Sequence, residues 1–408
     1  MSAPSTPVGS PTGATPPTGR LGGLGRLLGT VVALDAASSM VFALLASLRS
    51  EYGLATWHLG LISGSAFLGS VTAQLTLAGF ADRGRARALL RIGLGLAIVG
   101  NLLFAAGSSA VVFVAGRLLA GFGTGCFYPA ARAVAATTDP DRIGHNLGRM
   151  AAANLIGFTA GPVFGTVLAE VAGLRAPFLV AAAIAALSLT QLGRLPIPAS
   201  LEAPPDPAAQ REPVLAFDLL RQRPVAIAVG LAVALFVPIG MYDALWSQYL
   251  ADRGASATFV GVSMAIYGIP FALLASAGGR LADRVGPVRC ALAGLAVGAP
   301  MTWLYGVLPN PWLIASASIL EAAVQAASFP ATQTAMARAC PPGRLAAGQG
   351  LAGAFQQVTA ATTAFSAAPL YGATGSAVTF GAAGGLVGVL AIVLAFAQRA
   401  MRPSTNPR

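Results

Sequence analysis

The chain lacks lysine altogether and has few charged residues of any kind. Only 10% of its 408 residues are charged and 55% are hydrophobic, whereas a soluble domain usually carries about 25% charged residues. The three cysteines, Cys126, Cys290 and Cys340, have no metal-ligand spacing. Two of them fall in apolar stretches, so no disulfide is expected. This scarcity of charge excludes an ordinary soluble domain and indicates an integral membrane protein.

Other absences narrow the function. We find no phosphate-binding loop, metal cluster or nucleophile–base pair, so the sequence predicts neither an enzyme nor direct use of ATP, and no cofactor. Residues 1–19 hold 15 Pro, Ser, Thr or Gly and no charge. They lack the basic start and apolar middle of a signal peptide, and we expect a disordered tail over residues 1–25. The net charge of +11 comes from arginines beside apolar stretches, so no nucleic-acid partner is expected.

Long apolar stretches are what the sequence does contain. Each is about 20 residues, the length that crosses a bilayer core as a helix. They are continuous rather than alternating, which favours helices over a barrel. We place twelve spans at residues 26–48, 58–80, 88–107, 110–135, 146–172, 175–194, 225–249, 259–279, 288–307, 311–335, 347–371 and 376–397.

The distribution of arginine predicts the orientation. With the N-terminus in the cytoplasm, 21 of the 25 arginines, Arg132 among them, lie in cytoplasmic tails, connections and adjoining helix ends. The outside connections hold Arg49, Arg175 and Arg253, and Arg117 lies within a span. Both termini are therefore predicted to be cytoplasmic.

The spans divide into two groups of six. Residues 196–224 contain seven prolines and four acids, which indicates a cytoplasmic linker, with Val214–Arg223 as a short interfacial helix. The predicted fold is an all-α membrane protein with six-helix bundles at 26–195 and 225–397 and a C-terminal tail at 398–408. Such parallel repeats are typical of two-lobed transporters.

A charged motif occurs at corresponding places in the two halves. The complete copy is Gly279-Arg280-Leu281-Ala282-Asp283-Arg284-Val285-Gly286. The other copy, Gly79-Phe80-Ala81-Asp82-Arg83-Gly84-Arg85, lacks one residue between Asp82 and the basic run. Glycine permits a tight turn there, and the aspartate can pair with an arginine or a helix N-terminus. The pairs Pro129-Ala130 and Pro330-Ala331 also recur, near the ends of spans four and ten.

Two further motifs lie inside spans. Span four carries Arg117, Gly121 and Gly123, and a guanidinium within a bilayer needs partners unless it reaches the surface. Span five carries Gly157, Gly161, Pro162 and Gly165. Glycine at every fourth position makes a flat strip for close helix contact, and proline invites a kink.

Together these residues resemble the major facilitator superfamily over residues 26–397. The Asp-Arg motif matches the loop signature between helices two and three and its repeat between helices eight and nine. The series from Gly157 to Gly165 resembles the fifth-helix motif of drug:proton antiporters. The resemblance implies the twelve-helix drug:proton antiporter branch. It links Arg117 to proton coupling, the fifth-helix motif to the control of leak, and the loop aspartate to stabilising one access state.

Three acids lie inside spans, where an ionisable residue is a functional candidate. Asp35 either couples protons or binds substrate, or it forms a structural pair with Arg117 or backbone. Glu321 either binds a proton or substrate, or it is a neutral, hydrogen-bonded carboxyl group that joins helices. Asp243 belongs to the cavity or to its outer mouth. Other cavity candidates, equally readable as helix–helix hydrogen bonds, are Asn154, Tyr267, Gln325, Gln356 and Gln357.

We therefore expect a proton-driven exporter of small amphipathic organic molecules in a bacterial plasma membrane. Its partners would be a small-molecule substrate and membrane lipid, and a monomer would suffice. Two alternatives stay open. One is a symporter for a sugar, organic acid or amino acid, which the fifth-helix motif disfavours. The other is a non-transporting membrane receptor, which the intramembrane charges disfavour.

Overall fold

A computed structural model describes residues 18–203, 213 and 215–401, and within these ranges the chain is almost entirely helical without a strand. The long helices are α1 (Thr18–Tyr52), α2 (Thr56–Leu77), α3 (Ala86–Ala106), α4 (Ala110–Thr138), α5 (Ile143–Ala172), α6 (Ala176–Leu192), α8 (Arg223–Ala251), α9 (Ala257–Val285), α10 (Pro287–Val307), α11 (Pro311–Ala339) and α12 (Leu345–Arg399). Short 3-10 helices occupy Ala78–Phe80, Pro140–Arg142, Ala199–Leu201 and Ala216–Arg221, and a π-helical turn occupies Ala81–Arg85.

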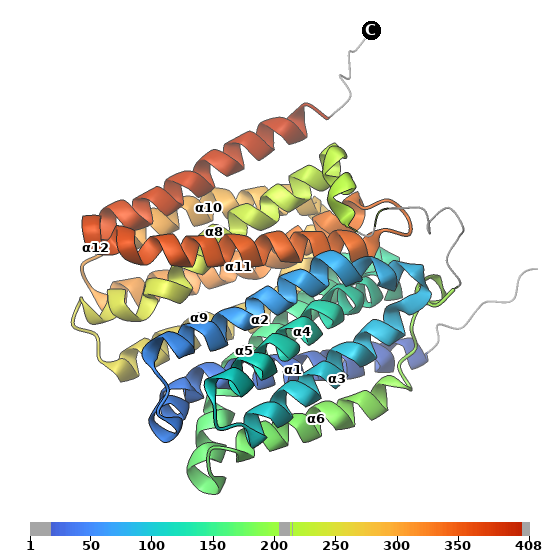
Figure 1. The fold of residues 1–408 in the computed structure, drawn as a ribbon. Coiled ribbons are helices and arrows are strands. Elements are labelled where there is room, and N and C mark those ends of the chain that lie inside the picture. The colour runs from blue at the N-terminus through green and yellow to red at the C-terminus, as the bar shows by residue number, and fades with distance from the viewer. Residues whose placement is uncertain (1–17, 204–212, 214, 402–408) are drawn as a thin grey trace, which may run out of the picture.

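The helices lie side by side in two groups. In Figure 1, α1–α6 (blue to green) occupy the lower part of the view and α8 and α10–α12 (yellow-green to red) the upper part, with α9 (yellow) beside α5. We call these groups the N-lobe and the C-lobe. The C-lobe has its own apolar core, in which Tyr249, Tyr305 and Phe380 are fully buried. The N-lobe packs around two clusters, centred on residues such as Phe127 and Phe113.

Twelve membrane crossings can be traced in these helices. Nine helical segments of the described chain are long and apolar enough to cross a membrane. One of them, Trp57–Ala106, contains both α2 and α3, and the 17-residue α6 is a further, shorter apolar helix. The segment α12 contains two crossings, because it doubles back at Gly375, whose φ of 80° is readily adopted only by glycine (Figure 1). The predicted all-α fold with twelve spans is confirmed.

Several predicted boundaries were wrong. Helix α1 starts at Thr18, so the last eight residues of the predicted tail at 1–25 are helical, while residues 1–17 lie outside the described ranges. The predicted span at 259–279 extends to Val285, because the motif residues up to Asp283 continue the helix instead of forming a turn. The predicted linker helix is a 3-10 helix at Ala216–Arg221, and Val214 lies outside the described residues.

Glycines set how closely the N-lobe helices approach one another. A Cβ atom added to Gly123 would lie 2.6 Å from the Gly93 carbonyl oxygen of α3, and one on Gly121 would collide with Ala66 of α2. Helix α4 therefore fits tightly between α2 and α3. On α5, a Cβ on Gly157 would lie 2.9 Å from the Asp35 Cβ, and one on Gly165 2.7 Å from the Met40 Cβ.

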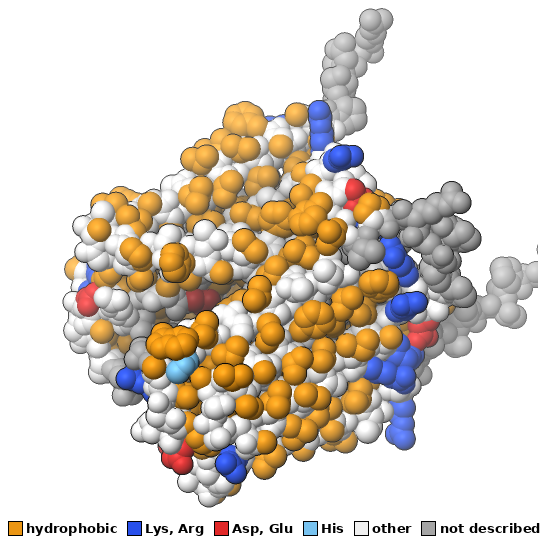
Figure 2. Space-filling model, in the orientation of Figure 1, with side chains coloured by type: hydrophobic (Ala, Val, Ile, Leu, Met, Phe, Trp, Pro, Cys, Tyr) orange, Lys and Arg blue, Asp and Glu red, His pale blue; other side chains and the backbone are white. Residues whose placement is uncertain are grey.

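One end of the molecule is rich in arginine. The first residues of α1 and the last residues of α12 lie at the same end of the bundle, on the right of Figure 1. Figure 2 shows most of the visible arginines along that edge, while hydrophobic side chains spread over the face between the two ends. Exposed apolar side chains such as Phe365 and Val171 suit contact with lipid rather than water.

Candidate functional site

The predicted candidate Asp35 is bonded to another predicted candidate. The Asn154 amide of α5 donates to the Asp35 carboxylate of α1 over 2.5 Å. Asn154 lies three residues before Gly157, where the absence of a side chain lets α5 approach α1 at Asp35. The fifth-helix glycines thus bring this pair together, and both side chains are half-buried.

Two residues of α4 complete the surroundings of Asp35, and sequence reasoning missed both. The Tyr128 hydroxyl and the Arg132 guanidinium are close enough to act electrostatically on Asp35. Arg132 also stacks over the Tyr128 ring, with 5.8 Å from its Cζ to the ring centroid. The arginine count assigned Arg132 to a cytoplasmic helix end, yet its side chain is half-buried beside Asp35. Its spacing from Tyr128, one helical turn on the same face, was the available signal.

Arg117 is buried, and the structure does not pair it with Asp35, a pairing that was one of the alternatives for that acid. Only 3% of Arg117 is exposed, so it does not reach the surface. Its guanidinium donates to the Ser38 carbonyl oxygen over 2.9 Å and lies 4.9 Å from the centroid of the Phe42 ring. Its Nε atom has no hydrogen-bond partner among the described residues. Ser38 and Arg117 line a cavity of about 20 Å³ together with Asn101 and Thr124, which is room for one water molecule.

Glu321 lies in the core of the C-lobe, where 2% of it is exposed. The Tyr242 hydroxyl donates to its carboxylate over 3.2 Å and is 3.0 Å from the Thr302 hydroxyl oxygen. Glu321 and Gln325, one turn apart on α11, line a cavity of about 10 Å³. The partners that the structure gives Glu321 are therefore neutral, unlike those of Asp35.

The remaining polar candidates are scattered. Tyr267 of α9 lies within electrostatic range of both Glu321 and Asp243. Asp243 itself is exposed, in agreement with a place at a mouth rather than in a core. Gln356 is buried, and its amide nitrogen has no described partner. Gln357 is half-buried, and the structure does not bring it to either carboxyl group.

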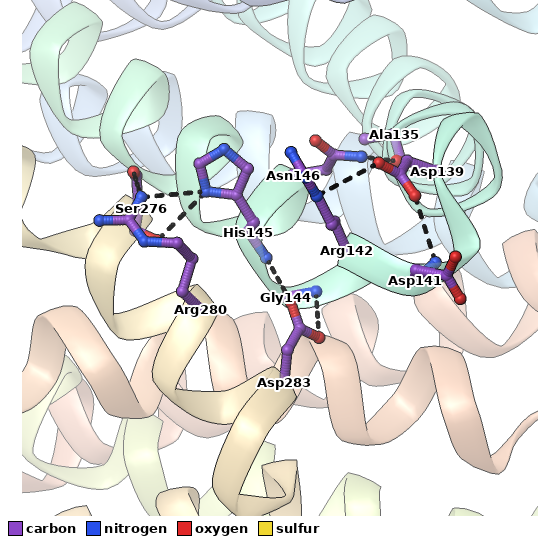
Figure 3. A network of polar contacts seen from close by, with 10 residues as sticks. All are labelled: Ala135, Asp139, Asp141, Arg142, Gly144, His145, Asn146, Ser276, Arg280 and Asp283. Carbon is purple, nitrogen blue, oxygen red and sulfur yellow. Dashed lines mark hydrogen bonds and ion pairs between the residues drawn. The ribbon is translucent and has the colours of Figure 1, made fainter. Parts of the chain in front are cut away.

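At the arginine-rich end, Asp283 ties the C-lobe to the N-lobe. Figure 3 shows its carboxylate below the N-terminus of α5, where it accepts from the backbone N–H groups of Gly144 at 2.9 Å and His145 at 3.0 Å. Arg338 of α11 donates to the same carboxylate over 2.9 Å. Across the contact, Arg280 lies 3.4 Å from His145 Nδ1. An acid at a helix N-terminus is favourable because the free N–H groups and the helix dipole are positive there.

Asp82 makes the matching tie in the opposite direction. Its carboxylate accepts from the backbone N–H groups of Ala346 and Ala347, each over 2.8 Å, at the start of α12. The turn is made by Gly84, whose φ is 76°, while Gly79 belongs to the 3-10 helix before it. Arg83 stacks on the neighbouring Phe80 ring. Two aspartates, one from each lobe, therefore close this end of the molecule, and we call these contacts the Asp82 gate and the Asp283 gate.

The glycines of the complete motif have different tasks from those expected. Gly279 lies inside α9, and a Cβ there would lie 2.6 Å from the Gly144 carbonyl carbon of α5. It permits the lobes to touch rather than a turn to form. The turn is made by Gly286, with φ of 101°, and Arg284 before it is exposed.

Nothing in the described residues assembles a metal site. Within residues 18–203, 213 and 215–401, no three His, Cys, Asp or Glu side chains are placed to hold an ion. Carboxyl, hydroxyl, amide and guanidinium groups are bonded to one another or to backbone inside each lobe. Two helical lobes with intramembrane charges and contacts that close one end define a multi-pass membrane transporter.

Comparison with known proteins agrees with this class. The family model described as Major Facilitator Superfamily matches residues 27–250 and 233–408. The chain belongs to the Major Facilitator Superfamily, and the predicted family is confirmed.

Several curated relatives carry one name. The chain is 31% identical over 291 residues to Multidrug resistance protein MdtG of Enterobacter lignolyticus (strain SCF1), covering 67% of this chain and 66% of the relative. It is 30% identical over 297 residues to the protein of that name from Serratia proteamaculans (strain 568), covering 69% of each. The chain thus spans about two thirds of the length of these relatives.

Two solved structures share the fold. The human organic anion transporter MFSD10 (TETRAN) superposes with a TM-score of 0.77 at 20% identity, over 93% of this chain and 100% of that one. The transporter FucP in the outward conformation gives 0.75 at 17% identity, over 94% and 100%.

Proposed function

We propose that this protein exports small amphipathic organic compounds across a bacterial plasma membrane in exchange for protons. Similarity to proteins named for multidrug resistance, from bacteria, supports efflux of this class of substrate. The arginine-rich end would face the cytoplasm, following the distribution of arginine in membrane proteins. The protein would act as a monomer among lipids, with no nucleic acid, and with the proton gradient in place of a cofactor.

The observation that carries the proposal is the difference between the two intramembrane acids. Glu321 is 2% exposed and bonded by the neutral Tyr242 hydroxyl. An unpaired carboxylate is costly in such surroundings, so we assign the transported proton to Glu321. Asp35 is half-buried, holds Asn154 and lies near Arg132. We therefore assign contact with the substrate to Asp35, whose side chain is the more exposed of the two.

Transport would follow from alternation between two states. With Asp82 and Asp283 both bonded, the arginine-rich end is closed. Opening that end requires both carboxylates to leave the helix N-termini, so that the lobes can rock about the intervening site. Proton binding at Glu321 and substrate binding near Asp35 would favour opposite states, and this differential affinity couples the two.

The test is proton release from purified protein in detergent on addition of cationic, neutral and anionic compounds. The wild type should release protons with some compounds. Glu321→Gln should abolish the release while compound binding, measured by tryptophan fluorescence, persists. Asp35→Asn should weaken binding at least tenfold.

Gln357→Ala is the control, because this half-buried side chain contacts neither carboxyl group. Proton release should be unchanged in this variant. Binding without any proton release by the wild type would contradict antiport. Uptake instead of efflux in cells would then indicate a symporter, and binding without flux in vesicles would indicate a receptor.

A further inference from the structure

The linker between the lobes is hydrogen-bonded to the start of α12 at the Asp82 gate. Asp218, in the 3-10 helix Ala216–Arg221, accepts two hydrogen bonds from Arg344, at 2.9 and 3.0 Å. Two-pronged contacts of this kind are the strongest arginine–carboxylate pairs. The Arg344 side chain is 9% exposed and that of Asp218 is 33% exposed. The hydrogen bond from Arg344 holds the pKa of Asp218 below its usual range, so the pair is charged at neutral pH.

Arg344 places a positive charge at the N-terminus of α12. It is the N-cap residue of α12, two and three residues before the N–H groups that Asp82 binds. The N-terminus of a helix carries a partial positive charge, so a guanidinium there is unfavourable unless an acid neutralises it. Asp218 supplies that acid. Its hydrogen bonds orient the Arg344 side chain and fix the start of α12, to which Asp82 binds.

The other end of the linker contacts the turn that carries Asp82 and the start of α3 that follows it. Arg87, in the first turn of α3, donates to Glu202 over 2.6 Å and to the Leu195 carbonyl oxygen over 3.0 Å. Gly84, in the turn itself, lies so close to the Ala203 carbonyl oxygen that a side chain would collide with it. The linker therefore touches both partners of the Asp82 gate, the turn in the N-lobe and the helix start in the C-lobe.

The Asp283 gate has a different support. Arg338 of the same lobe donates to Asp283. Counted from the matching Pro129 and Pro330, the α4 residue that corresponds to Arg338 is Thr137, which carries no charge. The described part of the linker makes no hydrogen bond to Asp283 or to the start of α5. The Asp283 gate is thus supported by Arg338 of its own lobe, and the Asp82 gate is supported by the linker.

We propose that the linker is a clasp on the Asp82 gate, in which Asp218 and Glu202 are the positioning residues. Asp218 acts through Arg344 and the start of α12, and Glu202 through Arg87 and the turn. Loss of either acid loosens closure at the arginine-rich end. The proposal concerns closure alone and depends neither on the substrate nor on proton coupling.

A native cysteine reports on this gate. Cys340 follows α11 and is half-buried. Its Sγ atom packs against Gly348 of α12 so closely that any side chain at Gly348 would clash with it. Burial, with a smaller contribution from the charge of Asp82 and an opposing one from that of Arg344, raises the pKa of its thiol to about 12. Thiolate is the reactive form, so Cys340 should react slowly with maleimide while the gate is closed. Cys126 and Cys290 are buried inside the lobes and report on unfolding.

The experiment measures the rate of N-ethylmaleimide labelling at each cysteine, by peptide mass spectrometry, for protein in lipid nanodiscs. Asp218→Asn should raise the rate at Cys340 about fivefold, the effect of losing a half-buried charged pair. Arg344→Lys, which keeps the positive charge near Cys340 but loses the two-pronged contact, should do the same. The double variant should add nothing, because both changes break one contact. Glu202→Gln should raise the rate more weakly. Asp141→Asn, at an exposed acid of the same end, is the matched control and should leave it unchanged.

Labelling of Cys340 at the wild-type rate in both Asp218→Asn and Glu202→Gln would overturn the proposal. A parallel rise at Cys126 and Cys290 would also overturn it, because Asp218 would then support the fold as a whole rather than the gate. The readout needs no transported compound. Failure of the clasp is therefore distinguishable from failure of proton-coupled export.

Discussion

The two lobes place their buried charges differently on corresponding helices. Counted from Pro129 and Pro330, Arg117 of α4 corresponds to Ser318 of α11, and Glu321 of α11 corresponds to Ala120 of α4. Both charged residues are at least 97% buried, and each lines a small cavity inside its own lobe. Each half of the repeat therefore keeps one buried charge on this helix, of opposite sign and about one turn apart. A duplicated fold can thus carry different chemistry in its two halves.

The gates differ in the same manner. Asp82 and Asp283 each accept two backbone N–H groups from the opposite lobe, so the central contact is preserved. What surrounds the contact is not preserved, since Gly279 and Gly144 meet at one gate where Ala78 and Ala346 are the corresponding residues at the other. Conserved bonding with different support means that the two gates should respond differently to substitution.

The largest effect should come from filling the glycine contact at the Asp283 gate. In Gly279→Ala the new Cβ would lie within 3.0 Å of backbone atoms of Gly144, which cannot move aside as a side chain can. Overpacking of this kind costs about 1–3 kcal/mol, and here the cost falls on the closed state alone. Transport into vesicles should fall at least tenfold.

The control for this prediction lies on the same helix. Gly261 of α9 has no atom within 4 Å of an added Cβ, so Gly261→Ala should transport at the wild-type rate. Equal losses in the two variants would mean that α9 tolerates no added side chain anywhere, and that the glycine contact has no special part in closure.

An intermediate effect is expected at Arg117, the buried arginine of the N-lobe. Arg117 has neutral partners in the structure, so its burial is costly and stability gives no reason to keep it. Arg117→Met should leave the unfolding temperature unchanged or higher, while proton-coupled transport falls at least tenfold. Thermal unfolding by intrinsic fluorescence and vesicle transport measure the two effects.

Thr124→Val serves as the partner variant, because Thr124 lines the same cavity but bonds its hydroxyl to the backbone of its own helix. It should change neither quantity. A fall in unfolding temperature for Arg117→Met that matches the loss of transport would assign Arg117 a structural task instead.

The smallest effect should be the pH dependence of the Asp218–Arg344 pair. The pKa of Asp218 is lowered in the folded protein, so the pair stabilises the fold above the ordinary aspartate pKa of about 4 and loses this contribution as pH falls through the lowered value. One third of the Asp218 side chain is exposed, which limits the contribution to about 1 kcal/mol or less.

The difference in unfolding temperature between wild type and Asp218→Asn should accordingly be constant from pH 8 to about pH 5 and shrink below about pH 4. Glu202→Gln provides a second acid of the linker for comparison. A difference that already vanishes between pH 7 and pH 6 would show that another group, and not Asp218, titrates in this contact.

The sequence predicted the helical fold well because hydrophobic length is a local property. A run of about 20 apolar residues must cross the bilayer as a helix whatever its neighbours do. Boundaries were less accurate, as at Asp283, because a helix that continues into water is not marked by hydrophobicity. The residues 268–285 of α9 form one helix, although only the first part is apolar.

The site was predicted less completely because burial alone does not show which helix faces meet. Asp35 and Asn154 were both candidates, but only the glycine contact between α5 and α1 shows that they bond. Arg132 was missed because position near a helix end and exposure to water are not the same property. A pair between Arg117 and Asp35 was one alternative, whereas the turn of α1 that Arg117 meets carries Ser38.

The glycine series of α5 has a consequence for the rate of turnover. Gly157, Gly161 and Gly165 leave no room between α5 and α1 over two helical turns, so we expect the two helices to rotate as one body. The bond between Asn154 and Asp35 lies inside that body. We therefore expect its energy to be the same before and after the lobes rock, and to add nothing to the barrier that separates the two states.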